Sequence, residues 1–294
     1  MNDPAYQRDK TGVQRNFSRA AAGYEQVAVL QQTIGQRLLE RLEVIRLTPQ
    51  RILDLGAGAG RLSAQLAQRY GRAQLVQLDL ALGMLQQAAQ NRGFSGRQSL
   101  LCADAEDLPV TGECMEFVFS NLMLQWVAQL DRTLVEAHRV LRPGGLLLFA
   151  TFGPDSLVEL RESWASVDDY IHVNAFTDMH DVGDALVRAG FVDPVMETEP
   201  FTLVYDDVAA LCKELKHLGA GNVNAGRRKT LTGARAFRAM QAEYRRRYAR
   251  ADGVPATFEA IYGHAWVPGV KQQRQEGLEP GVFPIAFSTA TRSS

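Results

Sequence analysis

The stretch RILDLGAGAG at residues 51–60 decides the fold of this chain. It is a short apolar run that ends in a glycine-rich turn, and a helical pattern from about Arg61 to Arg69 follows it. Glycine permits backbone dihedrals that a Cβ forbids, and it lets a ligand approach the main chain closely. The stretch therefore predicts a strand, a ligand-binding turn and a helix.

The same alternation of strand and helix continues on both sides of this turn. Ile34, Leu38, Leu39, Leu42 and Ile45 have helical spacing before it. The strands that we expect after it are QLVQLD (74–79), SLLCAD (99–104), FVFSNL (117–122) and GLLLFATF (145–152), with helices around 84–91 and 130–141. Apolar strands between helices are typical of a parallel sheet covered on both faces. The predicted fold class is α/β, Rossmann-like, with a doubly wound and mostly parallel sheet that binds ligands at the carboxyl ends of its strands.

The second half of the chain has a different pattern. It predicts a helix over 178–191, a strand pair or one long bent strand over 192–205, helices over 207–217 and 234–250, and a returning strand over 257–266. The predicted division is an N-terminal segment with the cofactor-binding core (1–205), a helical lid over the pocket (206–255), a returning core strand (256–270) and a flexible tail (271–294).

Composition narrows the class of protein. The 294 residues carry a net charge of −1, so no overall field favours nucleic acid or a membrane surface. Cys102, Cys114 and Cys212 are too few and too scattered for a disulfide framework, and the five histidines lack ligand spacing, so we expect no metal. The polar N-terminus and the absence of a long apolar run favour a cytoplasmic protein.

Acidic residues mark three predicted strand ends. Asp54 precedes the glycines, where a carboxylate can pair with the ammonium of a methionine tail but would repel a pyrophosphate. Asp79 is placed to accept hydrogen bonds from two ribose hydroxyls, and Asp104 to bind the exocyclic amine of adenine. Met84 could pack on the adenine face. Taken singly, each aspartate could cap a helix and Met84 could belong to the core.

Together these residues resemble the signature of class I S-adenosylmethionine-dependent methyltransferases, with an NAD-dependent dehydrogenase as the competing enzyme. The predicted cofactor is S-adenosylmethionine. The predicted cofactor-binding residues are Tyr24, Asp54, Gly56, Ala57, Gly58, Gly60, Asp79, Leu80, Met84, Asp104, Ala105 and Asn121.

The flanking segments resemble a narrower family, the malonyl-acyl-carrier-protein O-methyltransferases of biotin synthesis. The similar segments are FSRAAAGYEQVAVLQ (17–31), SNLMLQWV (120–127), HVNAF (172–176), GRRKTLTG (226–233) and VPATFEAIYGHAW (254–266). Ala57 and Ala59 depart slightly from the usual glycine loop. The resemblance implies methylation of the free carboxylate of a malonyl thioester, which primes pimeloyl synthesis. The implied partner is acyl carrier protein carrying malonyl, or else malonyl-coenzyme A.

This chemistry suggests roles for further residues. A carboxylate is ionised at neutral pH, so its methylation needs no general base. A forked cation suits a carboxylate, which makes Arg227 and Arg228 in the lid candidates, although each could be an exposed loop charge. Tyr24 could close over the methionine end or bind the substrate, or it could simply pack between helices. The predicted substrate-pocket residues are Asn121, Gln125, Trp126, His172 and Asn174.

A basic region runs from Arg227 to Arg250 and holds nine lysines and arginines. It fits docking of the acidic acyl carrier protein, and equally a solvated helix face. No aromatic stacking platform accompanies it, so we do not expect RNA binding. Two other functions stay open: a methyltransferase for another small acid or a quinone precursor, and a methyltransferase-like assembly factor for a respiratory complex. Asp54, Asp79 and Asp104 argue against the latter.

Overall fold

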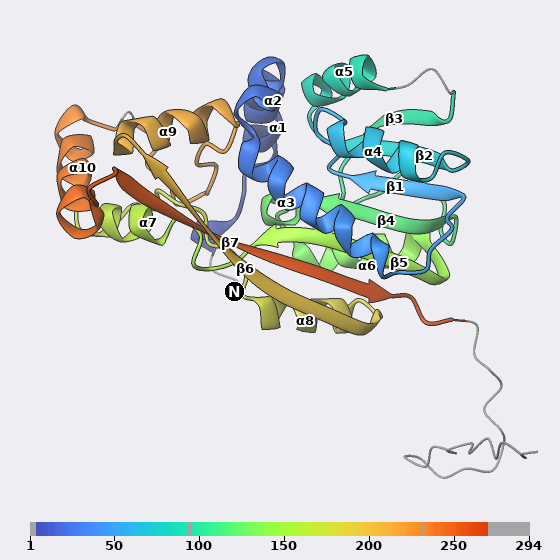
Figure 1. The fold of residues 1–294 in the computed structure, drawn as a ribbon. Coiled ribbons are helices and arrows are strands. Elements are labelled where there is room, and N and C mark those ends of the chain that lie inside the picture. The colour runs from blue at the N-terminus through green and yellow to red at the C-terminus, as the bar shows by residue number, and fades with distance from the viewer. Residues whose placement is uncertain (1–3, 93–95, 231, 270–294) are drawn as a thin grey trace, which may run out of the picture.

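A seven-stranded sheet forms the centre of the computed structural model, which describes residues 4–92, 96–230 and 232–269 (Figure 1). Its strands lie in the order β3-β2-β1-β4-β5-β7-β6. The strands are β1 (Arg51–Leu55), β2 (Gln74–Asp79), β3 (Gln98–Cys102), β4 (Met115–Asn121), β5 (Leu141–Phe152), β6 (Val192–Tyr205) and β7 (Val254–Trp266). The first five are parallel, and β7 runs antiparallel to both β5 and β6. The predicted doubly wound, mostly parallel sheet is confirmed.

Helices cover both faces of this sheet. The core helices are α3 (Val29–Glu40), α4 (Arg61–Arg69), α5 (Leu82–Asn91), α6 (Leu130–Val140) and α8 (Met179–Arg188). Successive side chains of a strand point to opposite faces. Accordingly, Ile52 joins the apolar cluster of Leu38 from α3, whereas Leu53 joins the cluster of Leu134 from α6. Both faces of β1 are therefore buried, which explains its continuous apolar sequence.

The strands β6 and β7 extend past the rest of the sheet (Figure 1). They pair from Val192 with Trp266 to Tyr205 with Val254, so the region over 192–205 is one long strand. Beside their far ends lies a helical lobe of α7 (Val158–Ala165), α9 (Val208–His217) and α10 (Ala234–Tyr248). The predicted lid thus supplies two of the three lobe helices, and β7 begins inside its predicted range. The tail predicted over 271–294 lies outside the described residues.

The N-terminal segment contributes two short helices, α1 (Lys10–Ala20) and α2 (Tyr24–Val27). The Asp9 carboxylate caps α1 by accepting a hydrogen bond from the Gly12 N–H at 3.1 Å. α1 packs so closely on α5 that a Cβ on Gly83 would lie 2.6 Å from the Ser18 carbonyl oxygen. This packing places the N-terminal helices beside the loops that follow β2 and β4.

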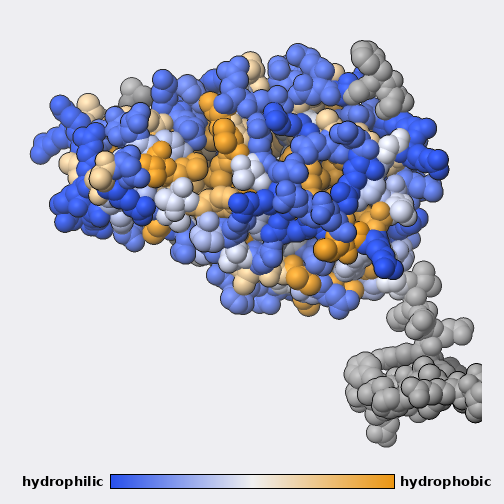
Figure 2. All heavy atoms as spheres, in the orientation of Figure 1, coloured by the Kyte–Doolittle hydropathy of each residue, from blue (hydrophilic) through white to orange (hydrophobic). Residues whose placement is uncertain are grey.

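The surface seen in Figure 2 is mostly hydrophilic, with hydrophobic side chains gathered between the helical lobe and the sheet. No helix in the described part of the chain is long and apolar enough to cross a membrane.

Candidate functional site

The glycine-rich turn after β1 is shaped by three residues with positive φ. Gly56 has φ +80°, and a Cβ there would collide with Met123. The Gly58 N–H donates a hydrogen bond to the Asp79 carboxylate at 2.9 Å. Gly60 has φ +83°, and its bare backbone lets α4 approach Ala88 of α5. Gly60 lines none of the cavities described below, so its packing is what the structure describes, and its role as a cofactor residue stays a prediction.

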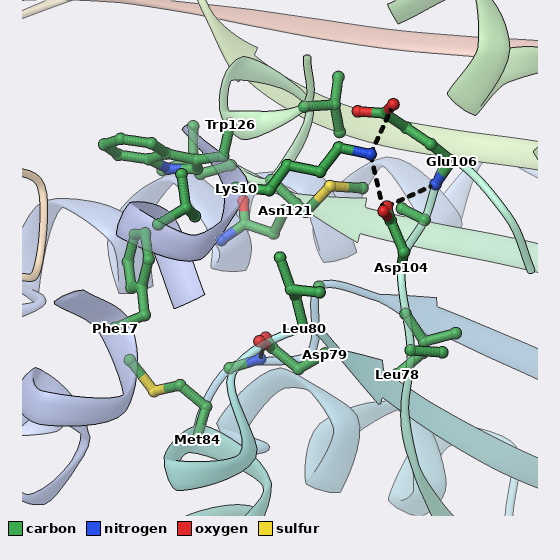
Figure 3. A pocket seen from close by; sticks show the side chains of 18 of the residues that line it. Lys10, Phe17, Leu78, Asp79, Leu80, Met84, Asp104, Glu106, Asn121 and Trp126 are labelled. Carbon is green, nitrogen blue, oxygen red and sulfur yellow. Dashed lines mark hydrogen bonds and ion pairs between the residues drawn. The ribbon is translucent and has the colours of Figure 1, made fainter. Parts of the chain in front are cut away.

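Two connected cavities form a cleft at the carboxyl ends of β1, β2 and β4. The first, of about 100 Å³, contains Tyr24, Gly56, Gly58, Asp79, Leu80, Met84, Asp104, Ala105 and Asn121 (Figure 3). The second, of about 70 Å³, contains Asp54 and Ala57 and shares Tyr24, Gly56, Gly58 and Asn121 with the first. The cleft therefore brings together every predicted cofactor residue except Gly60.

The cleft is electrostatically negative. Asp54 is 2% exposed, and burial raises its pKa to about 7 even though the Ser63 hydroxyl donates a hydrogen bond to it at 2.5 Å. Burial also raises the pKa of Asp79, although the backbone N–H groups of Ala81 and Gly58 donate to its carboxylate. Neither carboxylate has a cationic partner within the described residues. A ligand that brings a positive charge is therefore favoured here.

Two amide oxygens at the cleft lack hydrogen-bond partners. Among the described residues, Asn121 Oδ1 and Gln31 Oε1 are buried without a donor, although Asn121 Nδ2 donates to the Gln31 carbonyl at 3.1 Å. Both residues line the second cavity, next to Asp54. Buried polar atoms normally have partners, so this arrangement suits a ligand that carries donors such as an ammonium group. The residues present therefore fit S-adenosylmethionine. Gln31 was not predicted as a site residue, although it ends the segment 17–31 that resembles the methyltransferase family.

Lys10 closes one end of the cleft, which the sequence did not predict. Its Nζ lies 2.7 Å from the Asp104 carboxylate and 2.7 Å from that of Glu106 (Figure 3). Although burial alone would raise the pKa of Asp104, the hydrogen bond from Lys10 helps to lower it below its usual value. Lys10 precedes the segments that resemble the methyltransferase family, and no local pattern marks it.

A third cavity, which we call the aromatic cavity, adjoins the cleft and measures about 90 Å³. It shares Phe17, Tyr24, Leu122 and Trp126 with the first cavity and Tyr24 and Gln31 with the second. The rings of Phe17 and Trp126 meet edge to face at 5.1 Å. Tyr24 is the one described residue that lines all three cavities. It therefore stands where the cleft and the aromatic cavity join.

Four of the five predicted substrate-pocket residues line the aromatic cavity: Gln125, Trp126, His172 and Asn174. The fifth, Asn121, lines the cleft instead.

Some polar side chains of the aromatic cavity are hydrogen-bonded within the protein, and one is not. The Gln125 amide donates to the Leu122 carbonyl and accepts from Thr151, and Asn174 Oδ1 accepts from Asn224 at 2.8 Å. By contrast, the Tyr24 hydroxyl has no hydrogen-bond partner within the described part of the chain. Burial and the nearby Asp79 carboxylate raise the pKa of Tyr24 well above its usual value, so the hydroxyl stays protonated.

His172 is held firmly in the same wall. Its Nε2 lies 2.7 Å from the Asp168 carboxylate, and its ring stacks on that of Trp164 at 3.7 Å.

Arg227 and Arg228 do not line the aromatic cavity, and their role as the carboxylate grip stays a prediction. They line a wider groove on the outer side, which we call the outer groove. The Arg227 guanidinium donates to the Asn224 carbonyl at 2.9 Å and lies 3.5 Å from Asp9. Arg228 donates to the Thr230 hydroxyl and lies over the Tyr170 ring. An arginine suits a carboxylate, but both guanidinium groups here bond to residues of their own loop in the outer groove.

No metal centre accompanies these cavities in the described ranges, since no three His, Cys, Asp or Glu side chains gather there in a way that could hold an ion.

Known proteins resemble this chain at two levels. Residues 53–149 match the family model of the methyltransferase domain. A crystal structure of the YcgJ protein from Bacillus subtilis has a TM-score of 0.57 at 15% sequence identity, covering 80% of this chain and 99% of that one. At this identity, the likeness shows the fold alone.

Curated relatives give a finer assignment. The chain is 46% identical to the malonyl-[acyl-carrier protein] O-methyltransferase of Laribacter hongkongensis (strain HLHK9), over 96% of this chain and 97% of that protein. It is 47% identical to the protein of that name from Gallionella capsiferriformans (strain ES-2), over 90% and 93%. These matches rule out the alternative prediction of an NAD-dependent dehydrogenase. The chain belongs to the malonyl-[acyl-carrier protein] O-methyltransferase family.

Proposed function

We propose that this chain transfers a methyl group from S-adenosylmethionine to the free carboxylate of malonyl-acyl carrier protein. The observation that carries the proposal is the junction at Tyr24, where a cleft suited to a cationic cofactor opens into an apolar cavity. The names of the full-length relatives support the malonyl substrate. Methylation would remove the carboxylate charge, which fits a role in priming pimeloyl synthesis for biotin. We still expect the protein to be cytoplasmic. Its three cysteines are free thiols, which fits that expectation.

The cleft residues would hold the cofactor in distinct ways. When bound, S-adenosylmethionine supplies the methyl group that is transferred. Asp54 and the Gln31 and Asn121 amide oxygens offer acceptors to an ammonium group. Asp79 offers its carboxylate to ribose hydroxyls, while Asp104 and Met84 would bind the adenine edge and face. These contacts would orient the cofactor towards the junction.

On the acceptor side, the chain has to position an anion and exclude water. The malonyl carboxylate is already ionised at neutral pH, so Tyr24 is not needed as a base. Its protonated hydroxyl can instead donate a hydrogen bond that orients the carboxylate at the junction. The aromatic rings of Phe17, Trp126, Phe152 and Phe258 line the cavity and keep it poor in water. Because two opposite charges neutralise each other during transfer, such a dry site favours the reaction.

The test is methyl transfer to a panel of carrier-protein thioesters, followed by intact mass spectrometry. We expect one added methyl on malonyl-acyl carrier protein and none on the acetyl form, which lacks the carboxylate. Succinyl-acyl carrier protein tests the fit of a longer acid. Cofactor binding without methylation of any malonyl thioester would refute the proposal, and malonyl-coenzyme A run in parallel would show whether the carrier protein is required.

A further inference from the structure

The outer groove adjoins the aromatic cavity. It has a volume of about 870 Å³, compared with about 90 Å³ for the aromatic cavity. The two share Leu160, His172, Leu215, Ala220 and Asn222, so the groove opens onto the side of the aromatic cavity that faces α9. The opposite side meets the cofactor cleft through Phe17 and Trp126. The three spaces therefore follow one another, from the surface to the junction at Tyr24.

The outer groove is strongly positive for a chain with a net charge of −1. Its lining includes Arg19, Lys216, Arg227 and Arg228, and no Asp or Glu among the described residues. The side chains of Arg19 and Lys216 are exposed, and neither makes an ion pair or hydrogen bond within the described ranges. They come from α1 and α9, on the two sides of the groove. Unpaired cations on both sides of a groove attract an anionic partner.

The basic residues of α10 differ, although they dominated the predicted basic region. Arg246 and Arg247 both donate to the Glu243 carboxylate of the same helix. None of the residues of α10 lines the outer groove or the aromatic cavity. α10 lies at the far end of the helical lobe, away from the core sheet (Figure 1). Arg246 and Arg247 are thus neutralised within α10, and Arg235 and Arg245, although exposed and unpaired among the described residues, lie away from both cavities.

The volumes of the two cavities indicate which part of a thioester substrate each could hold. The aromatic cavity is small and apolar, so it suits the acyl end, whereas the carrier has to remain outside. The outer groove adjoins the aromatic cavity and shares no lining residue with the cofactor cleft. An acyl carrier protein bears its acyl group on a long arm and has an acidic surface. Its arm can follow the groove while its surface meets Arg19 and Lys216.

We propose that the outer groove is the docking site of the acidic acyl carrier protein, with Arg19 on α1 and Lys216 on α9 contacting the carrier and its arm entering beside His172. This proposal rests on the proposed function. It assigns the carrier protein, and not coenzyme A, as the partner that the groove recognises. It also makes Arg227 and Arg228 part of the docking surface.

The test reverses charge on both sides of the groove in the variant Arg19→Glu/Lys216→Glu. The matched control, Arg235→Glu/Arg245→Glu, makes the same charge change on exposed residues of α10. For each protein, kcat/KM is measured with malonyl-acyl carrier protein, malonyl-coenzyme A and malonyl-pantetheine at low salt. We expect the ratio of kcat/KM for the carrier protein to that for malonyl-pantetheine to fall about tenfold or more in the groove variant, mainly through KM, and to fall little in the control. Added salt should weaken the wild-type preference for the carrier protein and leave the groove variant less affected.

Three results would overturn the docking proposal: an equal fall of this ratio in both double variants, no change in the groove variant, or an equal loss with malonyl-coenzyme A and the carrier protein. The last would mean that the groove recognises the phosphates of coenzyme A. Failure of the proposed function looks different, because the wild type would then methylate none of the three thioesters. Thermal unfolding of each variant shows whether a lost activity reflects lost folding.

Discussion

The cofactor cleft and the aromatic cavity meet at Tyr24 but are built differently. The cleft is formed by the loops after adjacent parallel strands, and its chemistry comes from the buried or half-buried acids Asp54, Asp79 and Asp104. The aromatic cavity collects side chains from α2, α7, α9 and β7, which are far apart in the sequence. Its described lining contains no Asp or Glu. One space therefore attracts a cation, and the other has no carboxylate that would repel an anion.

This contrast explains how one small site can bring a sulfonium and a carboxylate together. Opposite charges have to be bound separately and then allowed to meet in a place that excludes water. The acids lie on the cleft side of the junction, and the rings of Phe17 and Trp126 lie at the junction itself. Changes on the cleft side should therefore act on cofactor binding, and changes at the junction should act on the rate of transfer.

The largest expected effect is on the cleft side. Asp79→Ala should raise the Kd for S-adenosylmethionine about 100-fold, because losing two hydrogen bonds to a charged group costs about 3 kcal/mol. Isothermal titration calorimetry measures this, with Asp181→Ala on the exposed side of α8 as the control. Asp79→Asn tests whether the loss arises from charge or from the loop, since Asp79 also accepts the Gly58 N–H. Unchanged affinity in both Asp79 variants would show that the cofactor does not use this carboxylate.

The next effect is a pH dependence from Asp54, whose pKa in the ligand-free protein is raised to about 7. A bound ammonium favours the ionised carboxylate, so binding releases a proton below that pH. The Kd should therefore rise about tenfold for each pH unit below about 7. Calorimetry from pH 5 to 8 checks this, and Asp54→Asn should show a flatter profile. An identical slope in Asp54→Asn would assign the titration to another group.

The same shift affects the stability of the ligand-free protein. The folded state binds a proton on Asp54 with a pKa of about 7, compared with 3.8 for the ordinary side chain. Between these values the folded state holds more protons than the unfolded state, so the free energy of unfolding should fall as pH rises from about 4 to 7. Urea unfolding at several pH values, with and without Asp54→Asn, measures this contribution.

At the junction, Tyr24→Phe should lower kcat for malonyl-acyl carrier protein about tenfold, since one hydrogen bond to a charged group is lost in the transition state. The Kd for S-adenosylmethionine should change much less, because the ring remains. Tyr248→Phe on α10 is the control, as its hydroxyl bonds Glu162 in the helical lobe. A loss confined to cofactor affinity would mean that Tyr24 acts in cofactor binding and not in methyl transfer.

The smallest effect concerns the contact between α1 and the cleft. Lys10→Met leaves the Glu106 carboxylate, which is 2% exposed, without its cation. Because Lys10 itself is partly exposed, solvent screening should limit the loss of stability to about 1 kcal/mol. Hydrogen exchange should increase over Lys10–Ala20, and Arg15→Met on the same helix should leave it unchanged. Equal exchange in both variants would mean that Lys10 does not fasten α1.

The two regions also differ in how far the sequence could predict them. The acids of the cleft were predictable because parallel strands end at a common edge, so Asp54, Asp79 and Asp104 had to lie near one another. The packing of α5 against the α carbon of Gly60 was not predictable, since a sequence does not show which helix lies there. Gln125 and Trp126 were predictable from their position after the fourth strand, whereas no periodicity connects His172 and Asn174 with that strand.

Long-range packing accounts for what the sequence did not predict. Lys10 and Gln31 lie on N-terminal helices, and their roles depend on where those helices pack. Arg227 was chosen for its forked charge, but its position depends on the loop after α9, whose Asn224 engages it. The region over 192–205 allowed either two strands or one, and pairing with β7 from Val192 to Tyr205, with one irregularity between Val192 and Val195, makes it one.

The most direct test of the central claim is to locate the transferred methyl. The protein is given S-adenosylmethionine with a deuterated methyl group and malonyl-acyl carrier protein, and the acyl arm of the product is analysed by tandem mass spectrometry. Our account predicts a single labelled methyl on the distal carboxylate, which mild alkali releases as labelled methanol. A label on carbon, on the carrier polypeptide or on no part of the carrier would contradict the transfer of methyl to a carboxylate at the Tyr24 junction.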